Sequence, residues 1–256
     1  MKANSGLVLG LIVLAGLLTA APARAEDAPE SCQVPDYLLA SDNALPKVAD
    51  ALKNGRSLDI LVIGSRSSTI NSPINASEAS AYPGRLQVAL KQKLPSIAVN
   101  VSVEILAKKT AEEVVAGLPK LMEGKKPILV IWQTGTVDAM RSLDLDDFRA
   151  AVGEGVVALQ EAGADVILMN PQYSPRTETM ISASPYLDNM RVAAQQHEVP
   201  LFDRFAIMQH WNEAGEFDLF SAFHGVELAK RVHDCLGRAL SQFVINAAHP
   251  DPAQQN

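Results

Sequence analysis

From residue 58 onward, short apolar segments alternate with longer amphipathic segments, and this alternation restricts the possible folds more than any other feature of the sequence. The apolar segments are predicted strands at 58–64, 97–106, 127–132, 165–170 and 199–202. The amphipathic segments are predicted helices at 84–94, 110–122, 146–162, 185–197 and 226–246. Such alternation is typical of a parallel sheet with helices on both faces. We therefore predict a single three-layer α/β/α domain with a five-stranded parallel sheet.

The segment 97–106 has a different pattern from the other predicted strands. Its apolar residues alternate with polar ones, at Val99, Val101, Val103 and Ile105. This alternation is typical of a strand that is covered well on only one face. We therefore expect the segment to lie at an edge of the sheet.

Two of the predicted helices have local boundary signals. Thr110 is a suitable N-cap with Glu113 at the third helical position, and Gly163 directly follows the segment 146–162. The Thr hydroxyl and the Glu carboxylate can each accept a backbone N–H at the start of a helix, whereas glycine commonly follows its end. We therefore expect one helix to start at Thr110 and another to end before Gly163.

The first 25 residues have the composition of a secretory signal peptide. Lys2 provides a positive start, residues 6–20 form an uncharged apolar segment, and Ala23-Arg24-Ala25 is a small-x-small cleavage site. The apolar segment is short for a membrane span, so an uncleaved anchor is the less favoured alternative. We therefore predict a periplasmic or secreted mature protein that begins near residue 26 and has no membrane span.

The rest of the chain divides into an arm, a domain and a tail. Cleavage after residue 25 of the 256-residue chain would leave 231 residues, which suits one sizeable domain. We predict a polar N-terminal arm at 26–57 with one helix near 45–52, the folded domain at 58–246, and a disordered tail at 247–256. The mature chain would keep 20 basic and 29 acidic residues, a net charge of −9. This acidic balance argues against nucleic acid or an anionic membrane as a partner.

The chain has two cysteines, Cys32 and Cys235. An even number of cysteines in a secreted protein favours a disulfide, here between the N-terminal arm and the last helix. Two separate buried thiols are the alternative. Neither cysteine has metal-type spacing to another Cys or His, so we predict no metal site.

Polar residues follow three of the predicted strands at the point where each strand ends. These clusters are "GSRSST" at 64–69, "QTGTVD" at 133–138 and "NPQYSPRT" at 170–177. Ligands of parallel α/β sheets bind beyond the carboxyl ends of the strands. We therefore expect the three clusters to converge on one site, with Ser65 and Ser67 as candidate nucleophiles.

A serine becomes a nucleophile only when a base reaches it. His224, in the loop before the last helix, is the favoured base, and Asp218 could orient it. His233 is a weaker candidate, because it fits better as a helix residue near the predicted disulfide. The remaining histidines look like helix-surface, helix-end or tail residues: His197, His210 and His249. Candidate oxyanion or pocket groups are backbone N–H groups near the serines and the residues Arg66, Gln133, Gly135, Thr136 and Gln172.

Several stretches between 58 and 245 resemble the SGNH/GDSL hydrolases, in a divergent secreted bacterial branch. "VIGSRSST" is similar to the family's first block, G-D-S with a following Thr, and "VIWQTGTVDA" is similar to the third block, G-x-N-D. "AYPGRLQVAL", "NPQYSPRT", "LFDRFAIMQHW" and "HDCLGRAL" also resemble that branch. The resemblance implies a flavodoxin-like strand order and a serine esterase that acts on acyl or acetyl esters of glycans or small molecules, without a cofactor.

The chain departs from the family's blocks at the positions that carry the chemistry. Arg66 stands at the usual place of the nucleophile, so Ser67 matches it only with one inserted residue, counted back from Thr69. Lys109, beside Lys108, stands where an oxyanion Gly is usual, and Val137 stands where the Asn donor is usual. In the last block, His224 leaves Ser221 at the place of the Asp.

These departures leave two functions to weigh, and a third is disfavoured. The first is a serine hydrolase that uses Ser67 or Ser65. The second is a catalytically degenerate relative that binds a glycan or a small anion, for which Arg66, Lys108 and Lys109 supply cations. The third, a nucleotide or flavin binder, is disfavoured because no G-x-G-x-x-G or Walker pattern follows the first strand.

Overall fold

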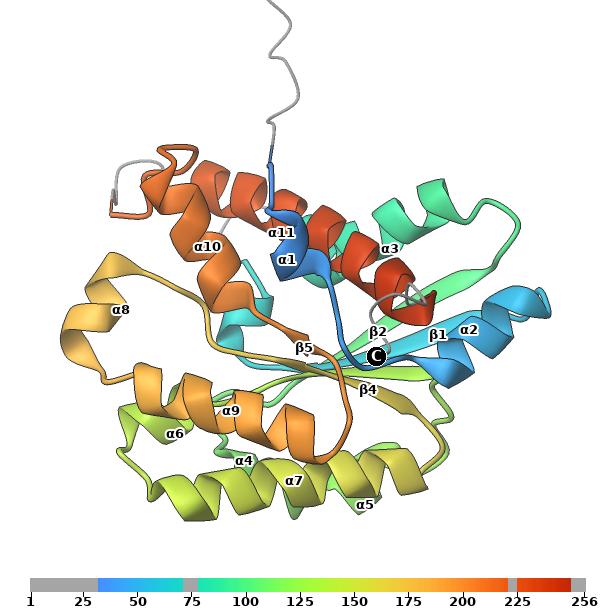
Figure 1. Cartoon of the computed structure of the whole chain (residues 1–256), viewed down its shortest axis with the longest axis horizontal. Helices are drawn as coiled ribbons and strands as arrows, with labels where there is room; N and C mark the ends of the chain where they lie inside the picture. Colours follow the sequence, from blue (N-terminus) through green and yellow to red (C-terminus); the bar gives the residue numbers. More distant parts are fainter. Residues whose placement is uncertain (1–31, 71–77, 221–224, 250–256) are drawn as a thin grey trace, which may run out of the picture. The chain divides into compact units, whose positions relative to one another are not determined.

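The computed structural model describes residues 32–70, 78–220 and 225–249, which form a three-layer α/β/α arrangement around one parallel sheet (Figure 1). The strands are β1 (Leu58–Gly64), β2 (Val99–Ile105), β3 (Leu129–Gln133), β4 (Asp165–Met169) and β5 (Leu201–Phe202). Their order is β2-β1-β3-β4-β5, and every pair is parallel. This order is the flavodoxin-like one. The predicted fold class is therefore confirmed.

Strand periodicity divides the apolar residues between the two faces of the sheet. In β1, Ile60 and Val62 pack against one helical layer, whereas Leu61 and Ile63 pack against the other. Because successive side chains of a strand point to opposite faces, a strand buried on both faces is apolar throughout. β2 lies at an edge as predicted, and its Val103 and Ile105 remain more than a third exposed.

In the described part of the chain, helices cover both faces of the sheet (Figure 1). The first layer comprises α1 (Asp36–Leu39), α2 (Pro46–Lys53), α3 (Tyr82–Lys93), α10 (Arg204–Glu213) and α11 (Gly225–Ala248). The second comprises α4 (Ala111–Val115), α5 (Leu118–Met122), α7 (Leu145–Glu161) and α9 (Ser184–Gln196). The other short helices of the described residues are η1 (Arg66–Ser68), η2 (Glu78–Ser80), α6 (Thr136–Met140) and α8 (Pro175–Met180).

The helix predicted at 110–122 is wrong in one respect, because it consists of two helices. Thr110 and Glu113 form the expected capping box at the start of α4. However, α4 ends at Val115, and α5 begins after Gly117 with Pro119 in its first turn. Proline lacks an N–H and its ring clashes with the carbonyl four residues earlier, here that of Val115, so one continuous helix is excluded.

Other boundaries differ at the ends of the chain and after β5. No helix range was predicted at α10, where Asp203 caps the helix by accepting the Ala206 N–H at 2.9 Å. The tail predicted at 247–256 begins too early, because Ala247 and Ala248 are buried in α11, where they complete its apolar face. The predicted signal peptide at 1–25 and residues 250–256 lie outside the described part of the chain.

The N-terminal arm is fastened to the domain by covalent and polar contacts. Cys32 and Cys235 form the predicted disulfide, with Cα atoms 5.5 Å apart, a normal separation for such a bond. The Trp211 indole N–H donates to the Gln33 carbonyl at 2.9 Å. These contacts hold the arm against α10 and α11.

α3 and α11 pack at an unusually short distance, and this approach positions two residues of the site. A Cβ built at Gly237 of α11 would lie 2.5 Å from Arg85 Cβ and 2.7 Å from Leu86 N, both of α3. Only glycine permits this approach. It brings His233 of α11 beside Tyr82 at the start of α3. None of the described helices is long and apolar enough to cross a membrane.

Candidate active site

The serine cluster forms the turn at the carboxyl end of β1. Ser65 caps the short helix η1, and its Oγ accepts the Ser67 N–H at 3.3 Å. The Oγ atoms of Ser65 and Ser67 lie 3.2 Å apart. Gly64 allows the turn, since a Cβ there would lie 2.7 Å from Ser68 Cβ. The turn therefore presents two neighbouring hydroxyls at the edge of the sheet.

Gln133, the last residue of β3, ties the serines to the second polar cluster. Its Oε1 accepts the Ser68 hydroxyl at 2.6 Å, and its Nε2 donates to Ser65 Oγ at 3.1 Å. Ser68 is buried, and its Oγ also lies 3.0 Å from the Tyr82 hydroxyl oxygen. The predicted convergence of the clusters after β1 and β3 is thus present in the structure, with Gln133 as the link.

Arg204, which follows β5, places a buried cation against Ser67. The side chain is 1% exposed. Its Nη1 donates to Ser67 Oγ at 3.1 Å, while Nη2 donates to the Ser67 carbonyl at 3.1 Å and to Gln172 Oε1 at 3.2 Å. Burial lowers the pKa of Arg204 to about 10, so the guanidinium stays charged at neutral pH. The contact with Gln172 brings in the third polar cluster, which follows β4.

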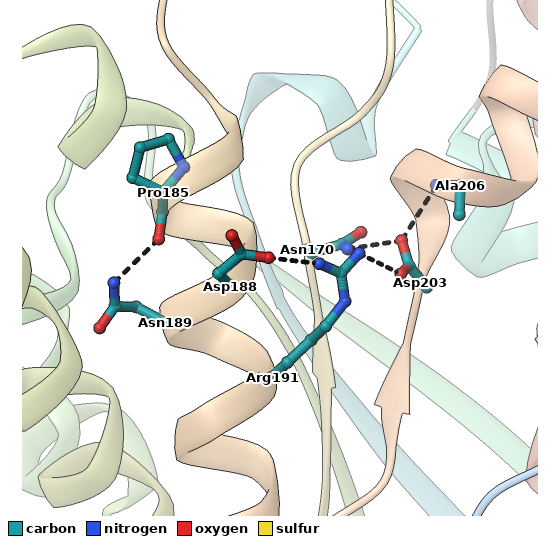
Figure 2. Close-up of polar contacts among 7 residues, drawn as sticks. All are labelled: Asn170, Pro185, Asp188, Asn189, Arg191, Asp203 and Ala206. Carbon is teal, nitrogen blue, oxygen red and sulfur yellow. Dashed lines mark hydrogen bonds and ion pairs between the residues drawn. The ribbon is translucent and has the colours of Figure 1, made fainter.

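A partly buried polar network holds the start of α10, and so holds Arg204; Figure 2 shows its contacts at Asp203. Asn170, directly after β4, donates to Asp203 Oδ1 at 2.7 Å and accepts the Phe205 N–H at 2.9 Å. Arg191 of α9 donates to Asp203 Oδ2 at 2.9 Å. Asp203 and Phe205 flank Arg204, so these bonds fix the backbone from which the guanidinium reaches Ser67.

His233 lies at this edge too, but in an arrangement unsuited to a general base. Its Nδ1 accepts the Tyr82 N–H at 2.9 Å, and its ring stacks on the Tyr82 ring with centroids 5.9 Å apart. Burial, together with the charge of Arg204, lowers the pKa of His233 to about 3. The ring is therefore neutral, and because Nδ1 accepts a hydrogen bond, its proton is assigned to Nε2. His233 can donate from Nε2 but has no free lone pair there to take a proton.

A cleft of about 700 Å³ opens above these groups. Its polar lining includes the side chains of Ser65, Ser67, Thr69, Thr136, Gln172 and His233. Its apolar lining comes from Ile70, Val137, Met140, Val226 and Ala229. Arg66 and Lys108 add two exposed cations. The cleft thus combines hydroxyl, amide and cationic groups with an apolar surface that an acyl group could contact.

The structure brings most of the predicted site residues together. Ser65, Arg66, Ser67, Thr136 and Gln172 all line the cleft. Two lie beneath it: Gln133 is bonded to Ser65, and Gly135 caps α6 at φ +93°, a left-handed conformation that favours glycine. Val137 and Lys108 line the cleft, whereas Lys109 is not part of its lining.

The predicted base and its partner remain predictions. His224 and Ser221 lie outside the described residues. Asp218 is exposed, and its Oδ1 accepts the Phe220 N–H at 3.1 Å.

Sequence reasoning missed Arg204, Tyr82 and Ser68. It inspected the residues after the first, third and fourth strands but not those after the fifth, where Arg204 is the second residue. The same rule about the carboxyl ends of strands would have found it. Ser68 lies in the predicted cluster at 64–69, but nothing local distinguishes it from the other serines, and Tyr82 had no comparable signal because it is the first residue of α3.

Comparison with protein families decides the relationship of this chain. The model of the Non-GDSL lipase-like family matches residues 31–250. The chain belongs to the Non-GDSL lipase-like family. The match covers the whole domain and all the residues of the site, so the resemblance to SGNH/GDSL hydrolases drawn from the sequence motifs is confirmed. None of the curated proteins matches the sequence significantly.

Solved structures share the fold of this Non-GDSL lipase-like chain at low sequence identity. TesA is 18% identical with a TM-score of 0.53, over 71% of this chain and 97% of its own. The acetylxylan esterase Axe2 from Geobacillus stearothermophilus is 20% identical with a TM-score of 0.57, over 73% and 94%. A lipase/acylhydrolase from Enterococcus faecalis is 18% identical with a TM-score of 0.54, over 72% and 93%. Two further Axe2 structures are of catalytic mutants, one with a serine and one with a histidine replaced by alanine.

Proposed function

We propose that the protein hydrolyses carboxylic esters in the cleft, with Ser67 as the nucleophile. The observation that carries this proposal is the convergence of serine, glutamine and threonine side chains on one cleft at the carboxyl ends of β1, β3 and β4. Proteins of the same fold support it, because Axe2 and the Enterococcus faecalis protein are an acetylxylan esterase and a lipase/acylhydrolase. The proposed substrates are acyl or acetyl esters of glycans or small molecules.

Ser67 suits the role better than Ser65 because of its hydrogen bonds. Ser65 Oγ accepts from two N–H donors, those of Gln133 Nε2 and of the Ser67 backbone. Ser67 Oγ accepts from one N–H donor, on Arg204. A hydroxyl oxygen has two lone pairs, so Ser67 keeps one for attack on a carbonyl carbon when the Ser65 hydroxyl donates to Gln133 Oε1, which lies 3.4 Å away.

The proposed reaction follows the acyl-enzyme scheme of serine hydrolases. Ser67 Oγ forms a bond to the carbonyl carbon, its proton passes to His224, and the carbonyl electron pair moves onto the oxygen. The carbon–oxygen bond to the leaving alcohol then breaks as that oxygen takes the proton from His224. Water attacks the acyl-enzyme in the same way and releases the acid. In this proposal Asp218 orients His224.

Two side chains of the cleft are suited to stabilise the oxyanion. Arg204 holds Gln172 by Oε1, which leaves the Nε2–H groups of Gln172 to donate elsewhere. The Thr136 hydroxyl is buried and has no hydrogen-bond partner among the described residues, although Thr136 lines the cleft. Gln133 is less suitable than the sequence indicates, because its Nε2 is used by Ser65.

Covalent labelling tests the proposal directly. A fluorophosphonate probe should label Ser67, as located by peptide mass spectrometry, and the wild type should hydrolyse nitrophenyl acetate. Loss of the nucleophile in a serine hydrolase removes about 10⁶-fold of kcat, so Ser67→Ala should have no measurable turnover. Ser65→Ala is the matched control and should still be labelled. Turnover that survives in Ser67→Ala, or labelling of Ser65 instead, would contradict this assignment.

Binding without turnover is a second candidate, and two observations favour it. His233 is held as a hydrogen-bond donor, and Val137 faces the cleft where the family's Asn donor is usual. The cations of Arg66 and Lys108 would then hold a glycan or a small anion. A wild-type protein that is neither labelled nor active, but whose thermal midpoint rises with inorganic phosphate, would support this function over the first.

The disulfide supports export of the protein, because such bonds persist in oxidising compartments. We propose that residues 1–25 direct the chain to the periplasm or the exterior and are then removed.

A further inference from the structure

Arg204 is a buried charge without an anionic partner among the described residues. It is 1% exposed, and the groups that it contacts are a hydroxyl, a carbonyl and an amide oxygen. Its Nε–H has no acceptor among the described residues, and the acceptors of its other N–H groups are neutral oxygens. The Tyr82 ring, with its centroid 5.5 Å from Cζ, is a weak substitute for an anion. An unpaired charge is unfavourable in a buried site, so this cation favours any negative charge that forms beside it.

The reacting serine is the group beside it. Attack of Ser67 on an ester changes the reacting atoms from neutral to a net charge of −1, shared between Oγ and the carbonyl oxygen. Arg204 Nη1 is 3.1 Å from Oγ before the reaction starts. A fixed cation in a site shielded from water stabilises such a charge without reorganisation, and it acts on the transition state more than on the neutral substrate.

We propose that Arg204 is a catalytic residue, whose guanidinium binds Ser67 Oγ and stabilises the negative charge that develops during attack. The inference rests on the proposed function of Ser67. Arg204 thereby adds charge stabilisation at a site where Val137 has no amide side chain and the Lys109 N–H already donates to the Leu106 carbonyl at 3.4 Å. Its position after β5 gives it access to the same strand edge as the serines.

A purely structural role would use the other two bonds of the guanidinium. Nη2 joins the Ser67 carbonyl to Gln172 Oε1 and so ties the turn after β1 to the loop after β4. Loss of that clamp would disturb the site without any charge effect. The test must therefore separate the charge on Arg204 from its contribution to the packing of these loops.

Arg204→Ala, Arg204→Lys and the control Arg149→Ala make that separation with nitrophenyl acetate as substrate. Arg149 of α7 bonds Asp146 and Asn189 and is not part of the cleft lining. We expect Arg204→Ala to lose about 10²-fold in kcat with KM changed less than about threefold, as for removal of one oxyanion donor. Millimolar guanidinium should restore part of kcat in Arg204→Ala, because it returns the charge without the clamp. Arg149→Ala should keep kcat within about threefold of the wild type.

Arg204→Lys covers the case in which Arg204→Ala fails to fold, as judged by circular dichroism. Lysine keeps the charge but cannot make both Nη2 hydrogen bonds, whereas glutamine keeps hydrogen-bonding capacity without charge. We therefore expect Arg204→Lys to retain at least about tenfold more activity than Arg204→Gln. Equal activity of Arg204→Lys and Arg204→Gln would overturn the proposal, as would a folded Arg204→Ala with wild-type kcat or no response to guanidinium. Failure of the proposed function is a different result, since the wild type itself would then be neither active nor labelled.

Discussion

Replacement of His233 by asparagine should make the protein more resistant to acid. Asn Oδ1 can accept the Tyr82 N–H as Nδ1 of His233 does at 2.9 Å, but asparagine takes up no proton. In the folded wild type, the pKa of His233 is about 3 against an ordinary value of 6.5. Between pH 3 and pH 6.5, the unfolded chain therefore binds a proton at this position, whereas the folded chain does not. Stability contributed by the neutral ring is complete above pH 6.5 and is lost as the pH falls towards 3.

The size of the effect follows from these two pKa values. Between pH 7 and pH 4.5, protonation of His233 in the unfolded state should lower the free energy of unfolding of the wild type by about 2.5 kcal/mol. His233→Asn does not undergo this decrease in the free energy of unfolding, and the two proteins share all other titrating groups. The difference in stability between variant and wild type should therefore change by about 2.5 kcal/mol in favour of the variant over the same pH range.

Urea denaturation followed by circular dichroism at the two pH values measures this difference. The comparison at pH 7 serves as the baseline, because any packing cost of asparagine appears there and cancels. Parallel pH dependences of the two proteins would refute the reasoning. That result would mean that His233 is protonated in the folded state, and hence that its Nδ1 is not held by the Tyr82 N–H.

Two further predictions concern the packing that supports the site. Gly237→Ala should destabilise the protein by about 2 kcal/mol, or about 4–8 °C in Tm. The new methyl group would overlap the backbone of α3, and the energy of this overlap exceeds the gain in helix propensity from glycine to alanine. Gly225→Ala on the same helix meets no atom within 4 Å and should be neutral or slightly stabilising; similar Tm values for both variants would contradict this account of the α3–α11 contact. Replacing Cys32 and Cys235 by serine should lower the free energy of unfolding by about 5 kcal/mol, because the bond closes a loop of 203 residues in the unfolded chain. Denaturation with and without reductant checks this, and unchanged stability would mean that the bond does not restrict the unfolded chain.

The sequence predicted the sheet well because strand signals are local. The apolar segment at Leu58–Gly64 is bounded as predicted, and the alternation of Val99, Val101 and Val103 correctly indicated an edge. The single helix predicted at 110–122 is wrong, because Pro119 lacks the N–H that a continuous helix would need at this position.

The candidate site was predicted in part. The rule that parallel strands end at a common edge correctly grouped Ser65, Ser67, Gln133 and Gln172. The rule could not tell which hydroxyl keeps a free lone pair or which nitrogen of His233 carries the proton. Those properties depend on Gln133, Arg204 and Tyr82, each of which is supplied by a different element of the fold.

By itself, the sequence determined the alternation of strands and helices, the parallel sheet and the edge at which polar groups collect, because each depends on residues within a few positions of one another. Only the tertiary structure decided the charge and hydrogen bonding of the site. Arg204 and Ser67 are 137 residues apart, and Tyr82 and His233 are 151 residues apart. Contacts over such separations form only when the sheet order and the close packing of α3, α10 and α11 bring the partners together, and burial then shifts their pKa values in a way that no local pattern encodes.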